Sequence, residues 1–150
     1  MEPARNIKVN ILASKDCRLP VYQTKGSSGL DLRASITEPI EISPLQRVLI
    51  PTGLAIAIPF GYEGQIRPRS GMAFQHGITC LNSPGTIDSD YRGEIKVLLI
   101  NLGQEPYLIQ PEERIAQLVF CPVITAEIQI VDELDGTVRN KGGFGHTGSF

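Results

Sequence analysis

The chain has 150 residues, of which 41% are hydrophobic and 20% charged, and its formal net charge is −2. A chain of this length is typically one domain that buries roughly 70% of its unfolded surface. The slightly acidic balance gives no general electrostatic reason to bind nucleic acid, and no apolar run is long enough to span a bilayer. Composition therefore predicts one globular domain without a nucleic-acid or membrane partner.

The first residues and the cysteines bear on the cellular compartment. The opening stretch MEPARNIKVNIL lacks the long apolar region and small-residue cleavage site of a secretory signal, so we expect a cytoplasmic location. Cys17, Cys80 and Cys121 are odd in number, widely separated and without a partner at metal-ligand spacing. We therefore interpret them as reduced thiols, in neither a disulfide framework nor a zinc site.

Short segments with alternating apolar residues run through the first 131 residues. The first two have apolar side chains at every second position: Ile7, Val9 and Ile11, then Leu30, Leu32 and Ala34. Further segments of this kind follow: RVLI, LAIAI, EIKVLLINL, YLIQ, RIAQLVF and AEIQIV. Turns are supplied by fifteen glycines and eleven prolines. The pattern predicts an all-β domain, a jelly-roll-like barrel or sandwich, with one short helix at SGMAFQHG.

Residues 132–150 differ from the rest, because they carry five glycines and almost no apolar alternation. Composition alone is typical of a disordered tail. Glycine, however, lets backbone N–H groups close around phosphate oxygens, and an aromatic ring offers a stacking face for a base. Interspersed with these glycines are residues of both kinds: Arg139, Lys141, Phe144, His146 and Thr147. We therefore expect a β domain over 1–131, and for residues 132–150 both a disordered tail and a flexible arm that orders over a nucleotide remain open.

Two segments have both a simple and a functional interpretation. IRPRSGMA is an exposed basic turn, or an anion site to which the Arg69 guanidinium, the Ser70 hydroxyl and a helix N-terminus donate. ERIAQLV is an edge strand with Arg114 and Gln117 facing solvent, or a second part of the same site. Each segment needs a partner elsewhere in the chain before the functional interpretation is favoured.

The stretch GTIDSDYRGEIK is more informative. If it forms a hairpin, Asp88 and Asp90 point the same way and repel each other, so something should compensate their charge. Solvation or a salt bridge to Arg92 is the simple answer. The functional alternative is a carboxylate that orients water for phosphoryl transfer.

Other hydrolytic chemistries find less support in the chain. The only histidines, His76 and His146, each lie beside a glycine, so no Ser-His-Asp constellation is evident. The H-x-E and P-C-x-x-C signature of zinc deaminases is also missing. Hydrolysis assisted by a divalent ion is better supported.

Five segments occur in a fixed order over residues 29 to 148: GLDLRA, RPRSG, GTIDSDYRGEI, RIAQLV and GGFGHTG. Together they resemble the five motifs of the trimeric dUTP pyrophosphatase (dUTPase) family. The resemblance implies a jelly-roll homotrimer with three active sites, each built from three chains and closed by a C-terminal arm. It also implies hydrolysis of dUTP to dUMP and pyrophosphate, which limits uracil incorporation into DNA and supplies dUMP for thymidylate synthesis.

The resemblance also implies residue roles. Asp88 would bind the deoxyribose 3′-hydroxyl and align the attacking water, Tyr91 would pack beneath the sugar, and Phe144 would cover the uracil. Asp31 would lie near Mg²⁺ through water, because the triphosphate itself chelates the metal. The uracil edge would be read by Asn82, Gly85, Thr86, Ile87 and Lys96. The phosphates would be contacted by Arg69, Ser70, Gly71, Gln117, Arg139, Gly145, His146 and Thr147.

Two departures from the fifth motif concern the arm. Asn140 follows Arg139 where glycine is common, and His146 stands where serine is often found. Asparagine tolerates a left-handed backbone better than most residues, so we expect the turn to survive. Histidine can still donate to phosphate, with a contribution that depends on pH.

Two other functions remain as alternatives. The related deoxycytidine triphosphate deaminases share the fold, but IDSDYRG supplies the acid-x-acid-Tyr run of the pyrophosphatases. A regulator that senses dUTP without hydrolysing it is the second alternative. An intact Asp88 and a complete arm argue against it.

Overall fold

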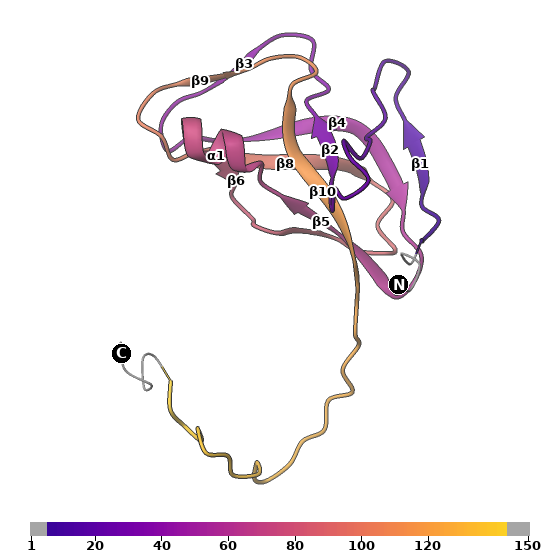
Figure 1. The fold of residues 1–150 in the computed structure, drawn as a ribbon, viewed down its shortest axis with the longest axis vertical. Coiled ribbons are helices and arrows are strands. Elements are labelled where there is room, and N and C mark those ends of the chain that lie inside the picture. Colours follow the sequence, from indigo (N-terminus) through magenta and orange to yellow (C-terminus); the bar gives the residue numbers. More distant parts are fainter. Residues whose placement is uncertain (1–5, 144–150) are drawn as a thin grey trace.

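The computed structural model describes residues 6–143, which form ten strands and one helix arranged in three antiparallel sheets (Figure 1). The first sheet has the order β1 (Asn10–Ala13), β4 (Arg47–Ala57), β8 (Glu94–Asn101) and β6 (Ile78–Cys80). The second has the order β2 (Leu30–Arg33), β10 (Arg114–Pro122), β5 (Tyr62–Arg67) and β7 (Gly85–Ile87). The third pairs β3 (Ile40–Ile42) with β9 (Tyr107–Ile109).

The hydrophobic core is built from strand residues whose burial alternates along the chain. In β8 the buried residues are Ile95, Val97 and Leu99, each with no exposed surface, and β4 shows the same alternation from Ile50 onward. Each large apolar side chain buried in this way contributes about 1.5–3 kcal/mol. The all-β prediction is confirmed, and the described strands form a sandwich of separate sheets and no closed barrel.

The segments RVLI and LAIAI form one long strand, β4, interrupted by an irregularity. The register against β8 shifts between Pro51 and Ala55. Proline cannot donate to a sheet ladder, so a bulge is a position where a central strand tolerates it. Within the bulge Gly53 has a φ of 69°, and its N–H donates to Glu94 Oε1 at 2.9 Å. This hydrogen bond ties the bulge to β8, the strand beside it.

The stretch GTIDSDYRGEIK does not form a hairpin, so that prediction was wrong. β7 pairs with β5, from Gly64 opposite Ile87 to Ile66 opposite Gly85, whereas β8 pairs with β4 and β6 in the other sheet. Both strands find partners that are distant in sequence and already part of a sheet. Residues 88–93 therefore cross from one sheet to the other, and Asp88 lies where β7 ends.

Two other strand predictions differ from the structure. RIAQLVF belongs to β10, which lies between β2 and β5 and is not an edge strand. AEIQIV forms no strand, and its Ile128 and Ile130 are 84% and 99% exposed. No sheet edge within residues 6–143 pairs with this segment. The described residues after β10 contain neither helix nor strand, and they run away from the sheets (Figure 1).

The predicted short helix is confirmed as α1 (Ser70–His76). It ends at Gly77, whose φ of 69° is the left-handed conformation that favours glycine after a helix. Of the helices in the described part of the chain, none has the length and apolar character needed to cross a membrane.

Candidate active site

A cavity of about 320 Å³ opens beside β7 and the residues that follow it, within the size range of small-molecule sites, roughly 300–1,000 Å³. Its lining comes from both large sheets and the connection between them: Leu49, Ile66, Asn82, Gly85, Thr86, Ile87, Asp88, Tyr91, Glu94 and Lys96. All seven residues that the sequence assigned to this part of the site, from Asn82 to Lys96, therefore lie around one cavity.

One wall of the cavity is made of backbone and an amide side chain. A Cβ atom on Gly85 would lie 3.1 Å from Asn82 Nδ2 and 3.4 Å from Ile66 Cβ. The absence of a side chain at Gly85 thus lets the Asn82 amide lie against the strand. An amide beside strand backbone presents both hydrogen-bond donors and acceptors, which is the combination that recognises the polar edge of a base.

Tyr91 is held by contacts within the crossing connection. Its hydroxyl donates to the Glu94 carbonyl at 3.1 Å, and a Cβ atom on Gly93 would lie 2.6 Å from Tyr91 Cζ. The ring is thus folded over Gly93. The Arg92 guanidinium donates to the carbonyls of Ser89 at 2.7 Å and Tyr91 at 2.8 Å, which further fixes the connection.

Asp88 follows β7 directly, and its side chain is exposed. Its carbonyl accepts a hydrogen bond from the Tyr91 N–H at 3.2 Å, so the backbone turns at this point. Within residues 6–143 neither Asp88 nor Asp90 takes part in an ion pair, and Arg92 contacts carbonyls instead. The Asp88 carboxylate therefore remains available to a ligand.

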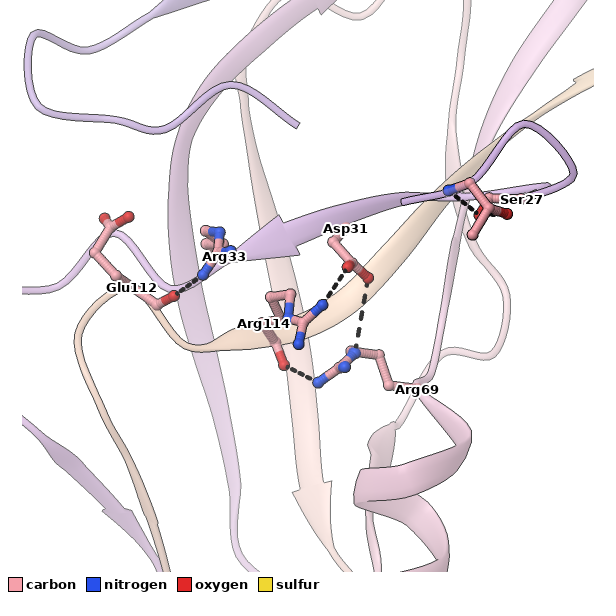
Figure 2. A network of polar contacts seen from close by, with 7 residues as sticks. Ser27, Asp31, Arg33, Arg69, Glu112 and Arg114 are labelled. Atoms are coloured by element: carbon pink, nitrogen blue, oxygen red, sulfur yellow. Dashed lines mark hydrogen bonds and ion pairs between the residues drawn. The ribbon is translucent and has the colours of Figure 1, made fainter. Parts of the chain in front are cut away.

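A second group of predicted site residues is linked by polar contacts on another part of the molecule (Figure 2). Asp31 on β2 lies between two guanidiniums: its Oδ1 is 3.7 Å from Arg69 Nε, and its Oδ2 is 3.2 Å from Arg114 Nη1. Arg69 Nη1 also donates to the Arg114 carbonyl at 2.8 Å. The carboxylate predicted near the metal and the arginine predicted at the phosphates are thus in contact.

Gln117 lies beside this network, opposite Asp31 in the register of β10 and β2. Its Nε2 donates to the Pro68 carbonyl at 3.0 Å, and a Cβ atom on Gly29 would lie 2.5 Å from its Oε1. Ser70 and Gly71 open α1 and are exposed. The described lining of the 320 Å³ cavity includes none of the members of this second group: Asp31, Arg69, Ser70, Gly71 and Gln117.

The described part of the arm contains a local turn. Arg139 Nε donates to the Gly142 carbonyl at 2.9 Å, and the Asn140 N–H donates to Thr137 Oγ1 at 3.0 Å. Asn140 has a φ of 43°, in the left-handed region that we expected it to tolerate. The remaining predicted arm residues lie outside the described residues: Phe144, Gly145, His146 and Thr147.

Sequence reasoning left the role of Arg114 open and missed Gly93 as a part of the site. The sequence placed Arg114 either facing solvent on an edge strand or in a second part of the anion site. The signal that could have found it is the adjacent pair Ile115 and Ala116, two apolar residues that break the alternation of their strand. Gly93 could have been found only by knowing where the Tyr91 ring lies.

Comparisons with known proteins agree with this geometry. The dUTPase family matches residues 15–148. The deoxyuridine 5′-triphosphate nucleotidohydrolase of Fusobacterium nucleatum is 53% identical over 144 residues, covering 96% of this chain and 99% of that protein. That of Chlamydia pneumoniae is 60% identical over 132 residues, covering 87% and 91%.

A solved structure shows the same fold. A variant of the Staphylococcus bacteriophage 80alpha dUTPase with dUpNHpp superposes with a TM-score of 0.82 at 27% identity, covering 95% of this chain and 99% of that one. These matches show that the chain belongs to the dUTPase family, and that its activity is the hydrolysis of dUTP.

Proposed function

We propose that Asp88 orients the water that attacks the α-phosphorus of dUTP, and that it binds the deoxyribose 3′-hydroxyl. The observation that supports this role is the position of Asp88, exposed at the rim of the 320 Å³ cavity and free of ion pairs among residues 6–143. An aspartate side chain exposed in this way accepts hydrogen bonds from both water and a sugar hydroxyl. As the water oxygen bonds to phosphorus, the bond to the bridging oxygen breaks and pyrophosphate leaves.

The cavity beside β7 suits the nucleoside half of the substrate. The Asn82 amide and the backbone of residues 85–87 would pair with the uracil edge, and Lys96 on β8 also lines the cavity. Cytosine has the opposite donor and acceptor pattern, so each buried group left unpaired would cost about 1–3 kcal/mol. The extra methyl of thymine would cost a similar amount in a well-packed cavity.

Tyr91 is proposed to select deoxyribose. The Tyr91 hydroxyl is hydrogen-bonded to the Glu94 carbonyl and its ring lies against Gly93. The ring therefore has little freedom to move away from the sugar. A ribose 2′-hydroxyl would therefore clash with the fixed Tyr91 ring.

The phosphates are proposed to bind the second group, contributed by a neighbouring chain of a homotrimer. Arg69 supplies a guanidinium, Ser70 a hydroxyl and Gly71 an N–H, with Gln117 beside them. Two observations support a shared site. The two groups do not line one cavity within the described chain, and the segment after β10 exposes apolar residues such as Ile124, at 95%. Where exposed apolar residues gather in a contiguous patch, they mark an interaction surface.

The arm, residues 132–150, is proposed to close over the site of another chain and to stand apart from the β domain, residues 1–131. Arg139 would reach the γ-phosphate and Phe144 would cover the uracil, with Gly145, His146 and Thr147 around the phosphates. The left-handed Asn140 supports a turn at which the arm can bend toward the nucleotide.

Magnesium is proposed to enter with the substrate, where it would neutralise charge on the chelated phosphate oxygens. Among the described residues no group of three or more His, Cys, Asp or Glu side chains could hold a metal ion. Mg²⁺ commonly keeps several waters and binds one or two carboxylates plus substrate phosphates. Asp31, with both oxygens facing guanidiniums, fits a contact with the metal through water.

Pyrophosphate release from dUTP with Mg²⁺, compared with the other deoxynucleoside triphosphates, tests the proposed specificity. Asp88→Asn should lower turnover far more than it weakens binding of dUpNHpp, and comparable losses in both would contradict the water-orienting role. Ammonia release from dCTP would favour a deaminase, and tight dUTP binding without pyrophosphate release would favour a sensor. In a cytoplasmic setting the reaction would limit uracil in DNA and supply dUMP for thymidylate synthesis.

A further inference from the structure

We propose that Arg114 is a positioning residue that keeps Arg69 available to the triphosphate by neutralising Asp31. The proposal rests on the proposed contact between Arg69 and the phosphates, and it concerns how that contact is prepared before substrate arrives.

The location of Arg114 follows from an irregularity in β10. Arg114 lies opposite Arg33 and Ala116 opposite Leu32, so Ile115 is an extra residue in the pairing with β2. Ile115 and Ala116 are consecutive and both buried, at 1% and 0% exposed. In a regular strand, positions 114 and 117 would face opposite sides of the sheet. The extra residue places Arg114 on the same face as Asp31 and Gln117.

Arg114 contacts the network in two ways (Figure 2). Its carbonyl accepts a hydrogen bond from Arg69 Nη1 at 2.8 Å, and its guanidinium pairs with Asp31 at 3.2 Å. Arg69 is thereby fixed through Nη1 and, toward Asp31, through Nε at 3.7 Å. In residues 6–143 Arg69 Nη2 makes no hydrogen bond, so this nitrogen of the guanidinium can donate to a ligand. An arginine already held in this way loses less side-chain freedom on binding.

The balance of charge gives Arg114 its role. The side chains of Asp31, Arg69 and Arg114 are only 16%, 30% and 39% exposed, so solvent screens the cluster incompletely. With both arginines the cluster has a net charge of +1. Without Arg114, Asp31 and Arg69 would form a neutral pair, and an incoming triphosphate would compete with Asp31 for one guanidinium. Arg33 does not replace Arg114 beside Asp31, because its Nη1 donates to the Glu112 carbonyl at 2.6 Å and, among residues 6–143, Asp31 forms ion pairs only with Arg69 and Arg114.

Arg114→Gln should therefore weaken binding of the triphosphate more than binding of the monophosphate. Measured by calorimetry on the full-length protein in EDTA, so that no metal contributes, the affinity for dUpNHpp should fall about tenfold. The affinity for dUMP should change less than about threefold, because one phosphate carries less negative charge and is attracted less strongly to the cationic cluster. With Mg²⁺ and dUTP, KM should rise and kcat should stay within about threefold, whereas partial unfolding would lower kcat and dUMP binding together.

Two further variants separate positioning from a general loss of charge. In EDTA, Asp31→Asn added to Arg114→Gln should recover most of the lost dUpNHpp affinity, because Arg69 then has no competing carboxylate. Arg47→Gln makes the same change of charge on β4 in the other sheet and should have little effect. Wild-type affinity in Arg114→Gln, or no recovery in the double variant, would overturn the proposal.

Arg69→Gln distinguishes this proposal from the proposed function. Unchanged dUpNHpp affinity in Arg69→Gln would show that Arg69 does not bind the phosphates, so the proposed phosphate site itself would be wrong. A loss in Arg69→Gln without a loss in Arg114→Gln would reject only the positioning role.

Discussion

Replacing Gly93 by alanine should damage sugar selection while leaving the fold nearly as stable as before. A Cβ atom at position 93 would lie 2.6 Å from Tyr91 Cζ, a distance that Cβ atoms essentially never adopt, and 3.0 Å from Tyr91 Cε2, which is tighter than most Cβ contacts. The Tyr91 ring must therefore move, and its hydrogen bond to the Glu94 carbonyl must lengthen or break. The ring is proposed to exclude ribose, so its displacement should admit a 2′-hydroxyl.

The expected stability change is small because two effects oppose each other. Loss of the Tyr91 hydrogen bond costs about 0.5–1.5 kcal/mol. Gly93 is not among the glycines with positive φ, so alanine is compatible with its backbone and restricts the unfolded chain, a gain of about 0.4–1 kcal/mol. The free energy of unfolding should thus change by less than about 1 kcal/mol. Relief of a steric barrier of about 1–3 kcal/mol should lower the preference for dUTP over UTP by roughly 5- to 150-fold.

The assay is the ratio of kcat/KM for dUTP to that for UTP, measured beside the thermal unfolding midpoint. Gly26→Ala is the matched control, because a Cβ atom there would meet nothing within 4 Å. An unchanged ratio in Gly93→Ala, with a normal unfolding midpoint, would refute the view that a fixed Tyr91 ring selects the sugar.

Two further predictions concern the second group and the core. Gly29→Ala should raise KM for dUTP, because a Cβ atom 2.5 Å from Gln117 Oε1 forces that side chain away from the Pro68 carbonyl; steady-state kinetics would show this, and an unchanged KM would argue against a phosphate-binding role for Gln117. Burial raises the pKa of the Cys80 thiol to about 11. An unfolded thiol titrates near 8.5, so the unfolded chain loses this proton first and the free energy of unfolding should fall between about pH 8.5 and 11. Denaturant titrations should find a shallower decline in Cys80→Ala, and identical slopes would contradict the assignment.

Alternation of apolar residues predicted the strands better than their partners. The pattern in EIKVLLINL identifies which face of β8 is buried, and the buried Ile95, Val97 and Leu99 agree with it. It carries no information on which strand lies alongside, because pairing depends on contacts far apart in sequence. The hairpin prediction failed for this reason. AEIQIV failed differently, since its pattern suits a strand but no strand among residues 6–143 pairs with it.

The same distinction explains which parts of the site could be predicted. Residues from Asn82 to Lys96 are close in sequence, so one motif located most of the cavity wall. The network of Asp31, Arg69 and Arg114 joins three segments, and although the motifs contain all three residues, they assigned a role only to Asp31 and Arg69. The face of the sheet on which Arg114 lies depends on the extra residue in β10. An extra residue of this kind reverses the face that simple alternation assigns to every residue on one side of it.

The order of the second sheet leads to a test of how the two groups combine. β2 and β7 are its two edges, three strand spacings or roughly 14 Å apart, so Asp31 and Asp88 belong to opposite margins of one chain. A rotationally symmetric assembly can bring the phosphate group of one chain against the cavity of the next, and each chain then contributes once in each role. Asp88→Asn and Arg69→Gln chains, each nearly inactive alone, should therefore regain activity when unfolded together and refolded as mixed assemblies of the proposed homotrimer. With random mixing at equal amounts, about a quarter of the sites would receive an intact Asp88 from one chain and an intact Arg69 from its neighbour. If both residues instead acted from the same chain, every site would carry one defect and the mixture would stay as inactive as its components.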